Sequence, residues 1–207
     1  MSHAPERLAA RTQWRRCAFH EAGHAVVGVL AGAGHILYAR MDARSPGTGI
    51  VRTRSRGRRA YNASFRFNFA NAMQAIAGPV AEARVCRQQE WWVGMMGLDE
   101  SRRFEEESAV SPLCDAALLR VTYDVACRQL VVAVCEELRS PILDREEISD
   151  VREFLGWMVY HLARKALLQN WASVEAIADA LMARGRISGR EIREIVYREA
   201  ARLGEAS

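Results

Sequence analysis

The sequence predicts a mainly helical α+β fold, in which one small β-sheet follows the first helix. Apolar residues recur at three- and four-residue steps along most of the chain, which is typical of helices packed on a core. Only two short segments, both just after the first helical pattern, have the composition of strands. The 207 residues, 50% of them hydrophobic and 26% charged, suffice for a sizeable core.

The first helix is expected over residues 11–33, where the glycines Gly32 and Gly34 end the pattern. Strands are then expected over 35–41 and 49–53, because β-branched and aromatic residues there flank a Ser-Pro-Gly turn. These two strands form the predicted small sheet.

Helical spacing returns in five later segments, which are 64–88, 111–138, 149–169, 173–183 and 188–203. Pro79 predicts either a kink in the first of these or a junction of two helices. Ser111 and Ser149 are expected to cap the helices that they open, and Ser188 with Glu191 forms a capping box. Residues 90–110 are expected to form a loop or a short irregular helix.

Composition excludes several classes of function. Lys165 is the only lysine and no glycine-rich loop precedes it, so the chain has no nucleotide-binding P-loop. The net charge of +4 is only mildly basic, and nucleic-acid binding is not indicated. The one dense basic run, residues 52–59, is expected to be a solvated loop. The alternative is that it binds nucleic acid, an acidic substrate or an acidic partner surface.

Targeting signals are not evident in the sequence. The N-terminus has no apolar signal core, and no segment reaches the roughly 18 uninterrupted apolar residues of a membrane span. The five cysteines form no Cys-x-x-Cys pair, which favours reduced thiols. We therefore expect a soluble cytoplasmic protein that does not engage a membrane.

The segment His20-Glu21-Ala22-Gly23-His24 matches the zinc-binding motif His-Glu-x-x-His. Residues four apart lie on one face of a helix, so both imidazoles could bind one metal ion, Zn²⁺ by preference. Glu21 lies beside the first histidine, where its carboxylate could activate a water molecule as a general base. The motif therefore predicts a metal centre on the first helix.

A catalytic zinc site needs a third protein ligand. The metzincin continuation is excluded, because Val27 and Leu30 stand where that class has glycine and histidine. The residues alone do not choose among the remaining candidates, which are Asp42, Glu82, Asp99, Cys114, Asp115 and His161.

The segment from Cys17 to Gly28, which reads CAFHEAGHAVVG, resembles the start of the peptidase domain of FtsH-type AAA zinc proteases. Two later segments fall in the family's order. The first, Gly49-Ile50-Val51, resembles the strand beside its active-site cleft. The second, AIAGPVAE over 75–82, resembles its Gly-Gly-Arg-x-Ala-Glu helix, although the second glycine and the arginine are replaced.

The resemblance implies a zinc metalloendopeptidase with Glu21 as catalytic base and His20, His24 and Asp115 as ligands. Asp115 lies where the family has an aspartate ligand near the start of a long helix, and Cys114 is the alternative thiolate ligand. The substrate would be a peptide or an unfolded protein, bound as an added strand along 49–53.

The resemblance also shapes the expected organisation of the chain. Residues 1–10 would be an extension and 11–203 a single peptidase domain, with a metal-site part over 11–138 and a C-terminal helical part over 149–203. The family's motor and membrane anchor are not evident, so we expect cleavage without ATP, a separate ATPase or adaptor chain, and a homo-oligomer.

Two other functions fit the same residues. One is a non-catalytic module in which zinc braces the helices and a surface recruits a partner. The other is a regulator-cleaving peptidase of a different His-Glu-x-x-His family, with another acid as its third ligand.

Overall fold

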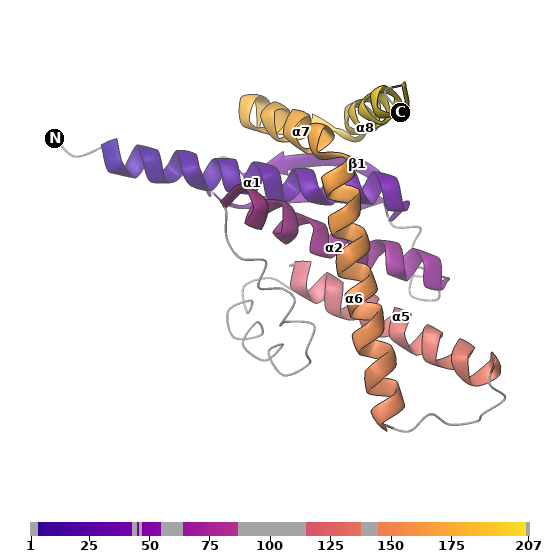
Figure 1. Cartoon of the computed structure of the whole chain (residues 1–207). Coiled ribbons are helices and arrows are strands. Elements are labelled where there is room, and N and C mark those ends of the chain that lie inside the picture. Colours follow the sequence, from indigo (N-terminus) through magenta and orange to yellow (C-terminus); the bar gives the residue numbers. More distant parts are fainter. Residues whose placement is uncertain are drawn as a thin grey trace.

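A computed structural model describes residues 4–42, 45, 47–54, 64–86, 115–137 and 145–205. Its elements in chain order are α1 (Ala4–Ala31), β1 (His35–Met41), β2 (Gly49–Arg54), α2 (Phe65–Cys86), α5 (Asp115–Glu137), α6 (Arg145–Gln169), α7 (Trp171–Arg184), β3 (Arg186–Ser188) and α8 (Gly189–Glu205). The fold is mainly helical with one small sheet, as the sequence predicts (Figure 1).

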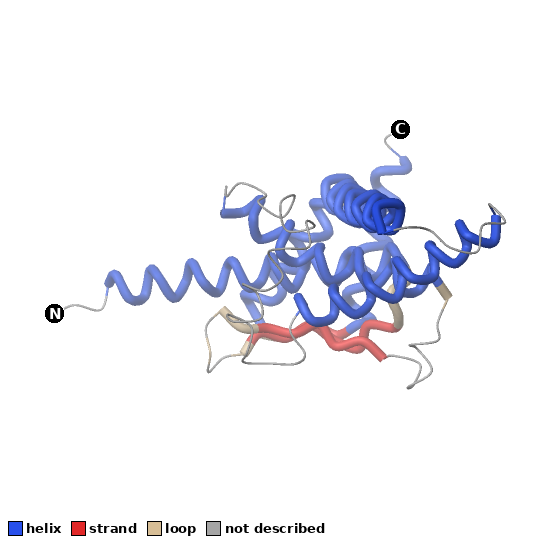
Figure 2. Tube along the Cα trace, turned by 90° about the horizontal axis from the view of Figure 1, so that it is seen from below, coloured by secondary structure: helices blue, strands red, loops and turns tan. Residues whose placement is uncertain are grey.

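The long helix α1 lies between the sheet and α2. It packs against β1 and β2 on one side and against α2 on the other, while α5 and α6 cover the far side of α2. The strands form one layer of the molecule, seen edge-on in Figure 2. Small residues allow α1 and α2 to approach closely, since a Cβ at Gly23 would lie 2.5 Å from the carbonyl oxygen of Ala77.

The sheet is antiparallel with the order β2-β1-β3, so within the described residues β2 is an edge strand. The pairing of β1 with β2 runs from His35 opposite Arg54 to Met41 opposite Gly49, which confirms the expected hairpin. Strand β3, from the C-terminal part of the chain, pairs with β1 through Tyr38 and Ser188. Sequence patterns did not predict this three-residue strand.

Several predicted helix ends are confirmed and others are corrected. Gly32 and Gly34 adopt positive φ angles of 71° and 122° after the last residue of α1. Pro79 lies inside one continuous helix, α2, rather than at a junction of two. At α8, the hydroxyl of Ser188 accepts a hydrogen bond from the backbone N–H of Glu191 at 3.2 Å, as the capping box predicts.

The predicted start of α6 at Ser149 is wrong, because the helix begins at Arg145 and Ser149 lies within it. Glu146 and Glu147 occupy the first turn, where carboxylates favour the positive end of the helix dipole. The predictions for residues 90–110 and for the cap at Ser111 lie outside the described residues.

The core holds side chains from most helices and from β1 and β3. Its largest fully buried members are Val26, Val27, Ile36, Ile76, Leu155, Val159, Leu167, Val174, Ile177, Leu181, Ile187 and Ile192. The described cysteines Cys17, Cys86 and Cys127 are free thiols. Among the helices of the described ranges, none combines the length and apolar character that crossing a membrane requires.

Candidate metal centre

The His-Glu-x-x-His motif lies in the part of α1 that packs between α2 and the sheet. The rings of His20 and His24 stand on adjacent helical turns, with centroids 4.7 Å apart and planes at 82°. His24 is 4% exposed and Glu21 5%, whereas the side chain of His20 is 20% exposed. The helix thus presents two imidazoles on one face, and His20 is the more accessible.

The backbone of α2 orients His24. Its Nδ1 lies 2.7 Å from the carbonyl oxygen of Gln74 in a buried hydrogen bond. A carbonyl can only accept, so Nδ1 carries the proton and donates it. In the neutral ring, Nε2 is then the nitrogen with a lone pair that could coordinate a metal.

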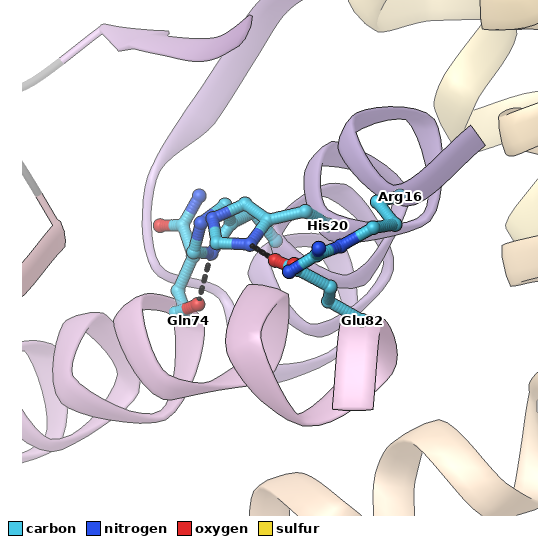
Figure 3. Close-up of polar contacts among 5 residues, drawn as sticks. Arg16, His20, Gln74 and Glu82 are labelled. Carbon is cyan, nitrogen blue, oxygen red and sulfur yellow. Dashed lines mark hydrogen bonds and ion pairs between the residues drawn. The ribbon is translucent and has the colours of Figure 1, made fainter. Parts of the chain in front are cut away.

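A carboxylate from α2 orients His20 in the same way. The Oε2 atom of Glu82 lies 2.9 Å from His20 Nδ1, and its Oε1 accepts hydrogen bonds from Nε and Nη2 of Arg16 at 2.9 and 2.6 Å (Figure 3). The hydrogen bond from His20, followed by that from Arg16, lowers the pKa of the Glu82 carboxyl to about 2, although burial opposes the shift.

Glu82 is therefore ionised at neutral pH, and His20 donates from Nδ1. Both motif histidines share one tautomer, with Nδ1–H held by an oxygen acceptor. Histidine ligands in metal sites have this arrangement, because an outer acceptor fixes the ring and makes the coordinating nitrogen more basic.

Two glycines give these side chains their space. A Cβ at Gly78 of α2 would overlap the imidazole of His24, and a Cβ at Gly49 of β2 would lie 2.6 Å from Cγ and Oε1 of Glu21. The first residue of the edge strand therefore lies directly against the motif glutamate. Both glycines belong to segments that carry the family resemblance.

The candidates for a third ligand fall in different places. Asp115 is the first residue of α5, which packs against α2, but its side chain lies outside the described part of the chain. Asp99 and Cys114 also lie outside the described residues. In the ranges whose side chains are described, no third His, Cys, Asp or Glu joins the two histidines in a metal-binding group.

The other three candidates have different surroundings. The two oxygens of Glu82 are hydrogen-bonded to His20 and Arg16, so this carboxylate orients the ring of His20. Asp42 is exposed where β1 ends, and its backbone N–H donates to the Thr48 carbonyl at 2.9 Å. His161 is exposed on α6, next to aromatic rings of its own helix.

Sequence reasoning missed three contributors to this centre. Arg16 lies one helical turn before His20, a spacing that could have indicated a neighbour of the motif. Gln74 contributes a backbone carbonyl, so its side-chain identity carried no signal. Glu82 is predicted as one of six candidate ligands and as part of the helix that resembles the family, whereas the structure places it behind His20 at Nδ1.

Comparison of the chain with protein-family models and with curated proteins gives no match.

Proposed function

We propose that the chain is a zinc-dependent metallopeptidase that cleaves peptides or unstructured proteins and needs no ATP for the reaction itself. One observation carries the proposal. Two imidazoles on one face of α1 each direct Nδ1–H to an oxygen of α2, and the motif glutamate lies beside them. This arrangement resembles that of histidine ligands in metal sites, in which an oxygen acceptor holds Nδ1–H, and it supports the proposal.

His20 and His24 would hold the ion through Nε2, and Asp115 would supply the third ligand by resemblance to the family. Zinc bound there supplies a Lewis acid that activates water at neutral pH and polarises a carbonyl oxygen. A carboxylate among the ligands would offset part of the charge of the ion.

Glu21 acts as the general base. Its carboxylate would take a proton from the attacking water and deliver it to the amide nitrogen as the C–N bond breaks, so that the product leaves as a neutral amine. Because Glu21 is buried, bulk water does not compete with this proton transfer. Gly49 supports the role, because only a residue without a side chain leaves room for the glutamate at this distance from β2.

The substrate binds as an additional strand along β2. This strand is at the edge of the sheet order, and its first residue lies against Glu21. Main-chain hydrogen bonds to an edge strand give affinity that depends little on sequence. An extended segment can make them and a folded domain cannot, which explains the proposed preference for unstructured substrates.

The test is cleavage of a broad library of unstructured peptides by the zinc-loaded protein and by its Glu21→Gln variant. We expect Glu21→Gln to keep its zinc and fold but to lose about 10²- to 10⁴-fold in rate, the usual contribution of a general base. His161→Ala removes an exposed histidine elsewhere and serves as the matched control with unchanged activity. A zinc-loaded protein that cleaves no peptide would favour the non-catalytic module.

A further inference from the structure

Helix α6 carries an exposed aromatic face. Phe154 and Trp157 are each 57% exposed, and their rings stack with centroids 6.4 Å apart. The centroid of the His161 ring lies 4.5 Å from that of Trp157. Leu168, seven residues after His161, is 38% exposed. Spacings of three, four and seven residues place these side chains in one stripe.

The opposite face of α6 holds the helix to the rest of the molecule. Leu155, Val159, Ala163 and Leu167 are buried there, and α6 packs against α2, α5 and α1. Figure 1 shows α6 crossing the molecule on the outer side of α2. The aromatic stripe therefore faces outward, and stripes of large exposed apolar side chains mark interaction sites.

Charges on the stripe identify what it can bind. Its N-terminal part carries the exposed acids Asp150 and Glu153, and its C-terminal part carries the exposed base Lys165. A second α6 turned end for end would bring the acidic part of one copy against the basic part of the other. The stripe is therefore complementary to itself in the antiparallel direction, whereas a parallel copy would oppose like charges.

The register follows from the positions of these residues. Asp150 and Lys165 lie equally far on either side of the peptide bond between Trp157 and Met158, and so do Phe154 and His161. A two-fold axis at this point would pair Asp150 of each copy with Lys165 of the other. It would also place the two Trp157 rings together at the centre.

We propose that the chain forms a symmetric homodimer in which two α6 helices pack antiparallel about Trp157. The interface is isologous, as two-fold symmetry requires. At about 1.5 Å per residue, the 25-residue helix offers a face roughly 37 Å long. One helix face buries less than the roughly 800 Å² per partner of a standard interface, so the dimer dissociates at micromolar concentrations.

Sedimentation velocity of the full chain from about 1 to 200 µM tests the proposal, since this range spans dimers of the expected strength. We expect a concentration-dependent shift from monomer to dimer. Trp157→Ser should weaken dimerisation at least about tenfold, because a central aromatic residue dominates such interfaces. Tyr197→Ser, which removes a 60% exposed aromatic side chain on α8, is the matched control and should leave the dimer unchanged.

Charge exchange tests the antiparallel register. Asp150→Lys and Lys165→Asp should each weaken the dimer about threefold or more, because two symmetry-related pairs become repulsive. The double variant should recover the affinity, and high salt should reduce all of these differences. Circular dichroism confirms that each variant is folded.

Three results would overturn the proposal. The first is a monomer at every concentration, which would leave the aromatic stripe to a different protein. The second is a dimer that is indifferent to Trp157→Ser, which would place the interface elsewhere. The third is a double charge variant that stays as weak as the single ones, which would exclude the antiparallel register.

Discussion

Glu82 connects a cation on one side with the first motif histidine on the other. Its two oxygens are divided between Arg16 and His20, so the carboxylate is held in place and in turn holds the imidazole. The hydrogen bond from His20 and then that from Arg16 favour the ionised form and lower the pKa of Glu82 to about 2. The ring of His20 is therefore oriented before any metal binds.

Replacing Glu82 by Gln should weaken zinc binding about 10- to 100-fold, because outer-shell partners of histidine ligands contribute that much. A zinc titration with a competing chelator measures the change. Glu194→Gln, at an exposed carboxylate that pairs with Arg190 on α8, is the control and should bind zinc normally. Unchanged zinc affinity in Glu82→Gln would contradict the orienting role of Glu82.

Gly78 is a second residue on which the proposed metal centre depends. In Gly78→Ala the new methyl group would overlap the ring of His24, so the ring or the helix must move. We expect a loss of zinc and a decrease of about 1–3 kcal/mol in the free energy of unfolding, as for other overpacked sites. Zinc content and thermal unfolding measure the two effects.

Gly32→Ala provides the control for this substitution. It also strains the protein, because Gly32 has a φ of 71°, but a Cβ there would meet no atom within 4 Å. It should lower stability and leave zinc content intact. If Gly78→Ala kept its zinc, the close packing of α2 against His24 would not be needed for the site.

The sequence indicated the centre at the level of residue types only. His20, Glu21 and His24 are recognisable because their spacing is meaningful on any helix. The acceptors of the two histidine Nδ1 protons are not recognisable in the sequence. The acceptor for His24 is a backbone carbonyl, and the acceptor for His20 lies more than sixty residues away. Such partners are set by how α2 packs on α1, which no local pattern encodes.

At the scale of elements, the hairpin and the helices beyond it were predictable from periodicity and turn chemistry. Strand β3 was not, because three residues between two helices give no alternation to detect. The start of α6 was misplaced because Ser149 looked like a cap, although the acids before it already begin the helix. Local signals thus located the elements better than their ends.

The edge position of β2 leads to a prediction about substrates. N-methylation of alternate backbone amides in a cleaved peptide should reduce its kcat/KM at least about tenfold, because each methyl removes a donor of the added strand. Methylation at the intervening amides, which point away from β2, is the control and should have little effect. Equal cleavage of both methylated peptides would exclude binding as a strand.

At the scale of the whole molecule, the C-terminal helices pack into one assembly with the helix and sheet that carry the motif residues. Strand β3 joins β1, the neighbour of β2, while α7 packs directly on α1. Arg193 of α8 donates to the backbone carbonyl of Ile36 in β1 at 3.1 Å. The C-terminal part thereby stabilises the sheet whose edge lies against Glu21.

The central claim is that the motif on α1 binds zinc, and native mass spectrometry of the purified protein tests it most directly. We expect one zinc ion per chain in the unmodified protein, and none in His24→Ala or Asp115→Ala after exposure to the same zinc concentration. The exposed histidine variant His161→Ala should keep its ion. An unmodified protein that remains folded but takes up no zinc would contradict the account.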